Sequence, residues 1–254
     1  MPENFAINYS CITDKGPWRK FNQDNFLCGK TYNNLFVKVT EYPLTGTLSS
    51  AEPSILGVFD GMGGEQDGEL AALFAAETAA KKVLSQEQEK DLLDICFTAN
   101  KRIYTYAQEN ERGSMGSTAA MLAFGTDRIS LCNIGDSKIF LIRNGTITQI
   151  SVDHLCDAPP GRKRMLYQNL GIPETDLKID PNIGYINYKP EDRYIICSDG
   201  LTDMVSQDQI LYSAMAWDVV NASKDLMMRA LQNGGKDNIT LIVAHVSRGV
   251  NKIE

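Results

Sequence analysis

Short blocks of apolar residues, some alternating with polar ones, recur along both halves of the chain and predict β-strands. Between them we predict a polar loop at residues 45–53, and residues 152–190 are the least regular stretch. The dipeptide Asn144-Gly145 predicts a tight hairpin turn, because both residues tolerate a positive φ. The predicted strands are 5–13, 25–29, 35–41, 54–59, 118–124, 129–134, 138–143, 146–151, 194–198 and 238–246.

Apolar residues spaced three and four apart predict amphipathic helices at about residues 65–84 and 87–110. Ser206 is a predicted helix start, and a further helix is predicted at about residues 218–232, where glycines follow its end. No internal repeat or linker divides the chain, so we predict a single domain over residues 1–254. Two blocks of strands around two central helices predict an α+β fold, with antiparallel sheets packed together and helices outside.

The composition narrows the classes of function. The chain has 254 residues, of which 43% are hydrophobic, and this is enough for a full core. A net charge of −7 and a pI of about 5.0 argue against nucleic acid or an anionic membrane as the main partner. No stretch reaches the roughly 20 apolar residues of a membrane span, and the first residues lack the features of a secretory signal. We therefore expect a cytoplasmic protein.

Cysteine and histidine usage argues against two common kinds of site. The six cysteines are scattered without a CxxC pair, which favours buried, reduced thiols, and two histidines are too few for a histidine-rich zinc site. Cys96 and Arg102 have the CX5R spacing of cysteine phosphatases, but Cys96 lies in a predicted helix whose amides are already bonded. Cys156 and Arg162 have the same spacing, but their loop contains an aspartate and two prolines, which donate no N–H. We predict that neither pair cradles a phosphate.

Two buried apolar runs end in the same way, with an aspartate followed by a glycine. Residues 57–64 place Asp60 after a predicted strand, and residues 194–203 place Asp199 after another. The glycine lets backbone approach a ligand closely, and the carboxylate is destabilising there unless a divalent cation neutralises it. We therefore expect both segments to contribute oxygen ligands to one metal site.

Six short motifs that contain acidic residues or glycine are spread along the chain. They are Arg19-Lys20-Phe21-Asn22-Gln23-Asp24, Asp60-Gly61-Met62-Gly63-Gly64, Gly116-Ser117-Thr118, Gly135-Asp136-Ser137, Ser198-Asp199-Gly200-Leu201-Thr202-Asp203 and Gly235-Lys236-Asp237-Asn238. Each alone is weak, since Asp-Gly pairs are common turns. Together, over about residues 10–246, they resemble the metal-dependent protein phosphatases of type 2C (the PPM family), in a bacterial-like form. The resemblance implies a four-layer α-β-β-α sandwich of two antiparallel sheets flanked by helices.

The resemblance also implies a protein serine/threonine phosphatase in which a water bridging two Mn²⁺ or Mg²⁺ ions attacks the phosphate. Asp60 would bridge both ions and the Gly61 carbonyl would bind one of them. Asp199 and Asp237 would complete the shell of the other ion. Carboxylate, carbonyl and water ligands favour Mg²⁺ or Mn²⁺ over zinc or copper, so the donor set agrees with this assignment.

The remaining assignments leave alternatives open. Asp24 would act mainly through bound water or as an acceptor outside the coordination shell. Asp136 and Asp203 match positions that bind a weaker third ion, although Asp136 could simply order its hairpin and Asp203 could cap a short helix. Arg19 would grip the substrate phosphate with its fork of donors, or it could be a surface arginine. Arg19, Asp24 and Asp60 are thus the candidate catalytic residues.

The chain departs from the family pattern at two places. Met62 stands where many eukaryotic members have a histidine that acts as general acid, and methionine has no proton to donate. The flap segment that follows Asp153-His154 is short, so residues 152–190 are predicted to form a reduced flap and family-based substrate selectivity does not carry over.

The partners implied by the resemblance are phosphorylated proteins, the substrates of a serine/threonine kinase. Two other functions are compatible with the same fold. The chain could be an interaction module that has lost the chemistry, or a partner-switching regulator with one dedicated phosphoprotein substrate. The intact acidic positions argue against the first of these alternatives.

Overall fold

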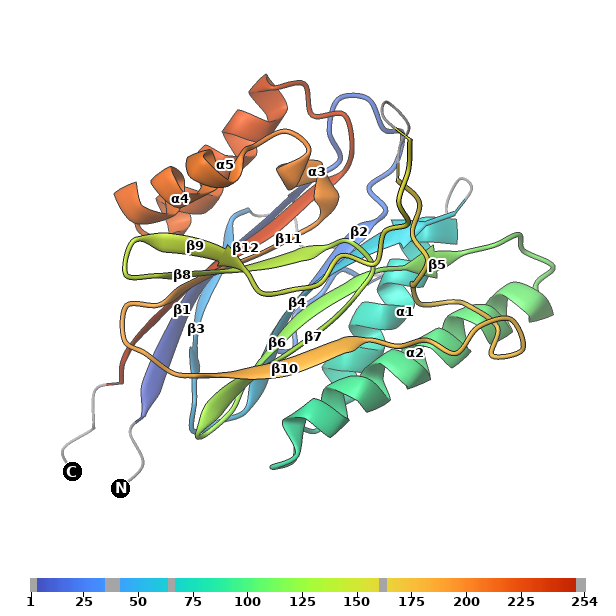
Figure 1. The fold of residues 1–254 in the computed structure, drawn as a ribbon, viewed down its shortest axis with the longest axis horizontal. Coiled ribbons are helices and arrows are strands. Elements are labelled where there is room, and N and C mark those ends of the chain that lie inside the picture. The colour runs from blue at the N-terminus through green and yellow to red at the C-terminus, as the bar shows by residue number, and fades with distance from the viewer. Residues whose placement is uncertain (1–3, 35–41, 64–66, 160–163, 250–254) are drawn as a thin grey trace.

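Two antiparallel β-sheets packed face to face form the centre of the chain in the computed structural model (Figure 1). The structure describes residues 4–34, 42–63, 67–159 and 164–249. The strands of the first sheet are β1 (Phe5–Asp14), β3 (Leu44–Ser49), β8 (Lys138–Arg143), β9 (Thr146–Gln149), β11 (Arg193–Cys197) and β12 (Ile239–Arg248). Those of the second are β2 (Asp24–Cys28), β4 (Ser54–Met62), β5 (Gly116–Ser117), β6 (Ala119–Phe124), β7 (Arg128–Ile134) and β10 (Asn182–Asn187). Their orders are β3-β1-β12-β11-β8-β9 and β10-β7-β6-β4-β2, with β5 paired to β4.

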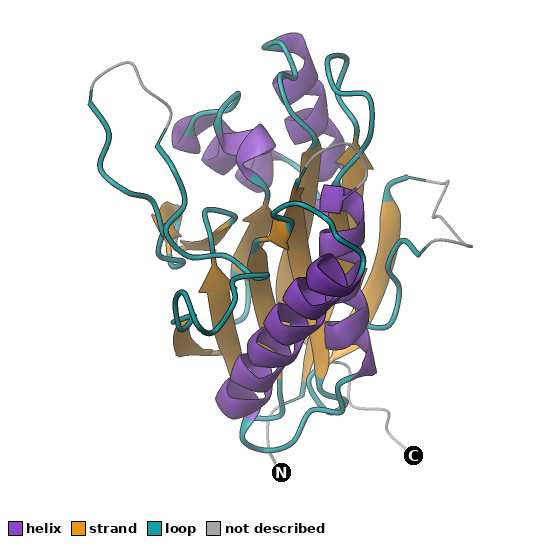
Figure 2. Cartoon of the chain, turned by 90° about the vertical axis from the view of Figure 1, so that its right-hand side faces the viewer, coloured by secondary structure: helices purple, strands orange, loops and turns teal. Residues whose placement is uncertain are grey.

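Helices cover the outer face of each sheet. The helices α1 (Asp67–Lys81) and α2 (Gln88–Glu109) lie against the second sheet, as Figure 2 shows. The helices α3 (Asp199–Thr202), α4 (Gln207–Ala216) and α5 (Val219–Gln232) lie at the first sheet. The predicted four-layer α-β-β-α sandwich is therefore confirmed. No described helix is long and apolar enough to cross a lipid bilayer.

Strand β4 illustrates how one apolar run builds two layers of core. Leu56 and Val58 pack between the sheets, whereas Ile55 and Phe59 pack toward α1 and α2. Successive side chains of a strand point to opposite faces, so a strand buried on both faces is a continuous apolar run. Burial of each such side chain contributes about 1.5–3 kcal/mol to folding. This run ends at Asp60, which the well-packed strand carries to the edge of the sandwich.

The predicted loop at residues 45–53 is wrong, because Leu44–Ser49 form the edge strand β3, which pairs with β1. Leu44 and Leu48 pack against the layer between the sheets, and the threonines between them face outward. Two apolar side chains in six residues are too sparse for alternation to be recognised against a polar background. The threonines are nevertheless favourable strand residues.

The irregular stretch 152–190 contains a second strand without a predicted counterpart, β10, which pairs with β7. Ile183 packs toward α2 and Ile186 packs between the sheets, so β10 also contributes to both layers. The single turn of α3 likewise has no counterpart among the predicted elements. The predicted strand at residues 35–41 lies outside the described residues. The other predicted strands and helices are confirmed, with shifts of a few residues at their ends.

Candidate metal centre and phosphate cleft

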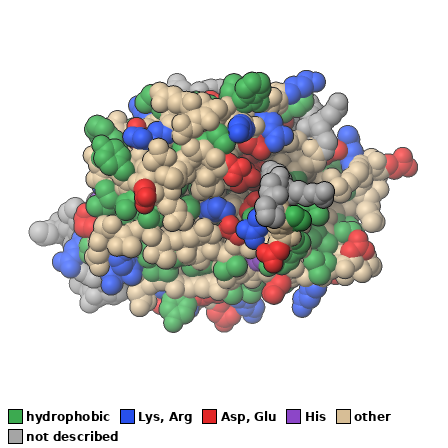
Figure 3. Space-filling model, turned by 45° about the horizontal axis from the view of Figure 1, so that its top comes forward, with side chains coloured by type: hydrophobic (Ala, Val, Ile, Leu, Met, Phe, Trp, Pro, Cys, Tyr) green, Lys and Arg blue, Asp and Glu red, His purple; other side chains and the backbone are tan. Residues whose placement is uncertain are grey.

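A cleft of about 510 Å³ opens at the edge of the sandwich where β2 begins and β4 and β11 end. In Figure 3, acidic side chains gather near the middle of the face that carries this edge, with lysine and arginine side chains beside them. The predicted site residues that line the cleft are Arg19, Asp60, Gly61, Asp136, Asp199 and Asp237. Segments far apart in the sequence thus meet at one place, as the motif order predicts.

Asp24 and Asp60 are direct cross-strand partners on β2 and β4. Like charges opposite each other on neighbouring strands destabilise a sheet, and here Asp24 is buried and Asp60 partly buried. Burial, together with the nearby Asp24 and Asp199, raises the pKa of Asp60 well above its ordinary value. The backbone around Asp60 is nonetheless firmly held, because its N–H donates to Thr118 Oγ1 at 3.0 Å and its carbonyl accepts from Thr118 N–H at 2.8 Å.

Asp24 lies beneath the cleft and is 5% exposed. Its Oδ2 accepts a hydrogen bond from Ser198 Oγ at 2.8 Å, which links β2 of one sheet to the end of β11 in the other. Its Oδ1 is buried and has no hydrogen-bond partner among the described residues. The pKa of Asp24 is raised to about 7, chiefly by burial and also by Asp199 and Asp237, against the lowering effect of hydrogen bonds from Ser198 and Thr240. An unpaired oxygen in an acidic, buried place fits a neighbouring cation or its water shell.

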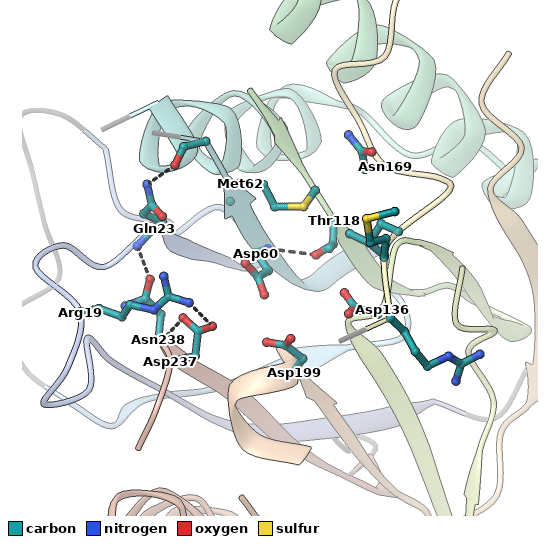
Figure 4. A pocket seen from close by; sticks show the side chains of 15 residues that line it. Arg19, Gln23, Asp60, Met62, Thr118, Asp136, Asn169, Asp199, Asp237 and Asn238 are labelled. Atoms are coloured by element: carbon teal, nitrogen blue, oxygen red, sulfur yellow. Dashed lines mark hydrogen bonds and ion pairs between the residues drawn. The ribbon is translucent and has the colours of Figure 1, made fainter. Parts of the chain in front are cut away.

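The carboxylates of Asp60, Asp136, Asp199 and Asp237 face a common space in Figure 4. Asp199 begins α3 directly after β11, and Asp136 lies in the turn between β7 and β8. A Cβ on the following residue, Gly200, would lie 2.0 Å from the carbonyl oxygen of Asn238, so glycine is required for the two strand ends to approach.

Gly61 is fixed by close backbone contacts as well. A Cβ at this position would lie 2.0 Å from the carbonyl oxygen of Gly68 and 2.5 Å from that of Gln23. The Gly61 N–H donates to the Gln23 carbonyl at 3.2 Å. The two glycines that the sequence places after aspartates therefore serve the same purpose, which is to let backbone pack closely around the cleft.

Arg19 forms an ion pair with a predicted metal ligand, Asp237, with 2.5 Å between Nη2 and Oδ2. The other oxygen of Asp237 accepts from the N–H of Asn238 at 2.8 Å. Both carboxylate oxygens are thus engaged, and a cation bound by Asp237 would compete with Arg19. Among the described residues, no three His, Cys, Asp or Glu side chains stand together as a ready metal-binding group. The donor chemistry fits Mn²⁺ or Mg²⁺, but Asp237 has to leave Arg19 to contribute fully.

Asn238 also lines the cleft, although it is not among the predicted site residues. Its Nδ2 donates to the carbonyls of Lys15 and Phe21 at 2.8 and 2.9 Å, and its Oδ1 accepts from Gln23 N–H at 2.8 Å. These bonds clamp the loop that carries Arg19 onto the start of β12. Its position directly after Asp237 in a motif could have marked it as a site residue. Its hydrogen-bond partners on the Arg19 loop become visible only in the fold.

The cleft is also lined by Arg164, Met165 and Leu166, together with Asn169 and Met62. Sequence reasoning missed Arg164, because it belongs to the irregular stretch and matches no motif. Arg164 is half exposed and its Nε donates to the carbonyl of Cys156 at 3.3 Å.

Two other predictions have clear outcomes. Asp203 is exposed at the C-terminal end of α3, outside the residues that line the cleft, and its N–H donates to the carbonyl of Asp199 at 2.8 Å. Cys96 is buried on α2 with its Sγ 3.6 Å from that of Cys132, and Arg102 pairs with Glu77. The first CX5R match therefore forms no phosphate loop. In the second, Cys156 is exposed and Arg162 lies outside the described residues.

Asp24 provides a test of the buried acidic site in protein freed of metal with EDTA. An unfolded aspartate loses its proton near pH 4, whereas the pKa of about 7 keeps Asp24 protonated in the fold. The folded state therefore binds more protons in this window, and its stability should fall as the pH rises from about 4 to 7. In Asp24→Asn the decrease in the free energy of unfolding over this pH range should be smaller than in wild type, by on the order of 1–3 kcal/mol. Urea unfolding at pH 5 and pH 8 measures it, with the exposed Asp208→Asn as control. An unchanged pH dependence in Asp24→Asn would contradict the assignment.

Comparison with known proteins places this geometry in a family. A family model described as Protein phosphatase 2C matches residues 12–192. The serine/threonine protein phosphatase PstP of Mycobacterium tuberculosis is 33% identical over 259 residues, which cover 95% of this chain and 45% of that protein. The serine/threonine phosphatase stp of Listeria welshimeri is 27% identical, over 91% of this chain and 92% of that protein. The chain thus spans less than half the length of the M. tuberculosis relative.

Solved structures agree with the sequence relatives. The crystal structure of M. tuberculosis PstP/Ppp superimposes with a TM-score of 0.79 at 26% identity, over 96% of this chain and 100% of that one. A second structure, the PstP catalytic domain in complex with two manganese ions, gives a TM-score of 0.79 at 26% identity, over 96% and 99% of the two chains. Because the family model matches most of the chain and a relative at 33% identity covers 95% of it, the chain belongs to the protein phosphatase 2C family.

Proposed function

We propose that this chain is a protein serine/threonine phosphatase that depends on Mn²⁺ or Mg²⁺. The observation that carries the proposal is the convergence of aspartates from four separate segments around one cleft, with an arginine at its rim. Such a cluster is unfavourable on its own and suits a divalent cation, and the adjacent arginine suits a phosphate dianion. The intact cluster gives no reason to prefer an interaction module without chemistry.

The residues that would hold two ions are Asp60, Asp199, Asp237 and the carbonyl of Gly61. Asp24 would accept hydrogen bonds from their water shell, and Asp136 with Asp203 would contribute to a weaker third site. When bound, two such ions would lower the pKa of a water for in-line attack on phosphorus and neutralise the phosphoryl oxygens. The PstP catalytic domain, whose structure contains two manganese ions, supports this choice of metal.

Arg19 would bind the substrate phosphate with its fork of N–H donors. In the structure the same fork holds Asp237, so the arginine is already turned toward the cleft. A cation at Asp237 would release the arginine for the phosphate. Met62 lines the cleft and has no proton to give, so no side chain at this position protonates the leaving group.

The substrates that we propose are phosphoserine and phosphothreonine in proteins phosphorylated by a serine/threonine kinase. This rests on the names of the relatives, which are serine/threonine phosphatases. The acidic net charge of −7 argues against nucleic acid as a partner. We also propose that the protein acts in the cytoplasm, where such kinases and their substrates meet.

Metal removal tests the proposal directly. EDTA should abolish hydrolysis of phosphoserine and phosphothreonine peptides, and Mn²⁺ should restore it, because hard oxygen ligands exchange their ion readily. Phosphate release from peptides of all three types, with phosphotyrosine included, measures activity and selectivity together. Full activity in thoroughly chelated protein would refute metal dependence, and no activity with Mn²⁺ on any peptide would refute the phosphatase.

Arg19→Ala separates phosphate binding from metal binding. The KM for a phosphopeptide should rise about tenfold with a smaller loss in kcat, because the arginine meets the dianion before and during reaction. The Mn²⁺ concentration for half-maximal activity should fall, since Asp237 loses its competing partner. Lys20→Ala is the matched control, because Lys20 lies 5.0 Å from the centre of the Phe21 ring and does not line the cleft. An unchanged KM in Arg19→Ala would remove this residue from the phosphate site.

A further inference from the structure

Residues 154–159 and 164–167 run antiparallel beside the cleft, and we call them the paired arms. A bridge joins Leu155 to Leu166, and backbone hydrogen bonds of 2.8 and 3.0 Å lie on either side of it. The second arm contributes Arg164 and Leu166 to the lining of the cleft. The paired arms are therefore the base of one cleft wall, and anything that fixes them also fixes the shape of the cleft.

The first residue of the paired arms, His154, is held on three sides. It is 5% exposed. Its ring Nδ1 lies 3.1 Å from the Gly135 nitrogen, which donates to it in the neutral tautomer, and 3.3 Å from the Gly135 carbonyl oxygen. The backbone N–H of His154 donates to the same carbonyl at 3.0 Å. Its carbonyl accepts from Tyr167 N–H at 3.0 Å, and the Tyr167 ring meets the imidazole edge to face at 5.5 Å. The backbone and ring of one residue thus join both arms to one glycine.

That glycine belongs to the turn that carries Asp136. Gly135 has a φ of +95°, and a Cβ there would lie 2.6 Å from Thr118 Cγ2, so the turn is tightly packed. Ser137 follows, with its Oγ 2.6 Å from the Thr118 Oγ1 that also accepts from the N–H of Asp60. The turn is therefore tied to the backbone of the central aspartate on one side and to His154 on the other.

A lysine reinforces the same connection. Lys138 Nζ donates to the carbonyl of Asp136 at 3.2 Å and to Asp153 Oδ2 at 2.6 Å, just before the paired arms begin. The imidazole itself is suited to its contact, because burial lowers the pKa of His154 and only a neutral ring can accept at Nδ1. No cleft-lining atom belongs to His154, so its effect has to pass through the residues that it holds.

We propose that His154 is a positioning residue, which holds the paired arms against the Asp136 turn so that the cleft wall and the metal-facing carboxylate are set together. This inference rests on the proposed function, since it concerns the same cleft. Its consequence is coupling in both directions. A cation at Asp136 would order the paired arms, and a substrate protein pressing on the arms would favour cation binding at Asp136.

The test replaces His154 with side chains that differ in whether, and at what distance from the backbone, they carry an acceptor for the Gly135 N–H. His154→Asn retains an acceptor close to the position of Nδ1, whereas His154→Gln offers it one bond further out and His154→Leu offers none. His245→Leu is the control, because the chain's other histidine lies on β12 and pairs with Glu191 at 3.1 Å. Hydrogen exchange at the amides of Gly135, Cys156 and Tyr167, with and without Mn²⁺ and without substrate, reports the coupling independently of turnover.

In wild type and His154→Asn, Mn²⁺ should slow exchange at all three amides. In His154→Gln and His154→Leu, exchange at Cys156 and Tyr167 should be about tenfold faster and insensitive to Mn²⁺, as expected for loss of one buried hydrogen bond. The KM for a phosphopeptide should rise in these two variants while the KM for p-nitrophenyl phosphate stays unchanged. Equal exchange in His154→Gln, His154→Asn and wild type would overturn the inference, even if His154→Leu fails to fold. Absence of turnover in wild type would instead refute the proposed function.

Discussion

Mutual repulsion among the aspartates at one edge of the sandwich is the constraint on which the rest of the site depends. Unit charges 4 Å apart near a protein surface interact by about 4 kcal/mol, so several carboxylates can share a cleft only if something compensates. The chain's own residues compensate this repulsion only in part. Arg19 neutralises Asp237, Ser198 donates to Asp24, and the pKa values of Asp24 and Asp60 are raised so that protons reduce the charge. A bound cation would supply the positive charge that these arrangements supply only in part.

The fold tolerates this unfavourable cluster because its strands are held elsewhere. Side chains of β4 pack into two layers of core, and the backbone of Asp60 is fixed by Thr118. Gly61 and Gly200 allow contacts that any Cβ would block. Asn238 clamps the Arg19 loop to the start of β12. Apolar burial and backbone hydrogen bonds thus fix the segments that carry the aspartates, and they offset the repulsion between the carboxylates.

Sequence reasoning predicts the fold and the cleft to the extent that they follow from strong local patterns. The apolar run before Asp60 predicts a buried strand, and the Asp-Gly sequence after it predicts a site at the end of that strand. The family resemblance that the ordered motifs carry then implies that Asp237 joins Asp60 and Asp199 at one site. The strand β3 is missed because its apolar side chains are sparse, and β10 because it lies in a stretch without periodicity.

What the sequence does not predict are interactions between segments with no shared pattern. Asn238 acts on backbone carbonyls more than 200 positions away. His154 acts on a turn 19 positions away, through a ring nitrogen. Arg164 reaches the cleft because two short arms pair, which neither arm predicts alone. Asp203 belongs to a motif, yet it lies exposed at the end of α3 and does not line the cleft, so its role in a third ion site stays a prediction.

The central claim, that the aspartate cluster exists to hold cations, is tested most directly by Mn²⁺ titration calorimetry of metal-free wild type and Asp60→Asn. We expect the wild type to bind two ions and Asp60→Asn to lose most of this binding. Metal-free Asp60→Asn should also unfold a few degrees, about 2–6 °C, above metal-free wild type, because asparagine avoids the cost of holding an acid there either charged beside other carboxylates or protonated. The exposed Asp208→Asn should behave like wild type in both measurements. Equal Mn²⁺ binding by wild type and Asp60→Asn would contradict the account.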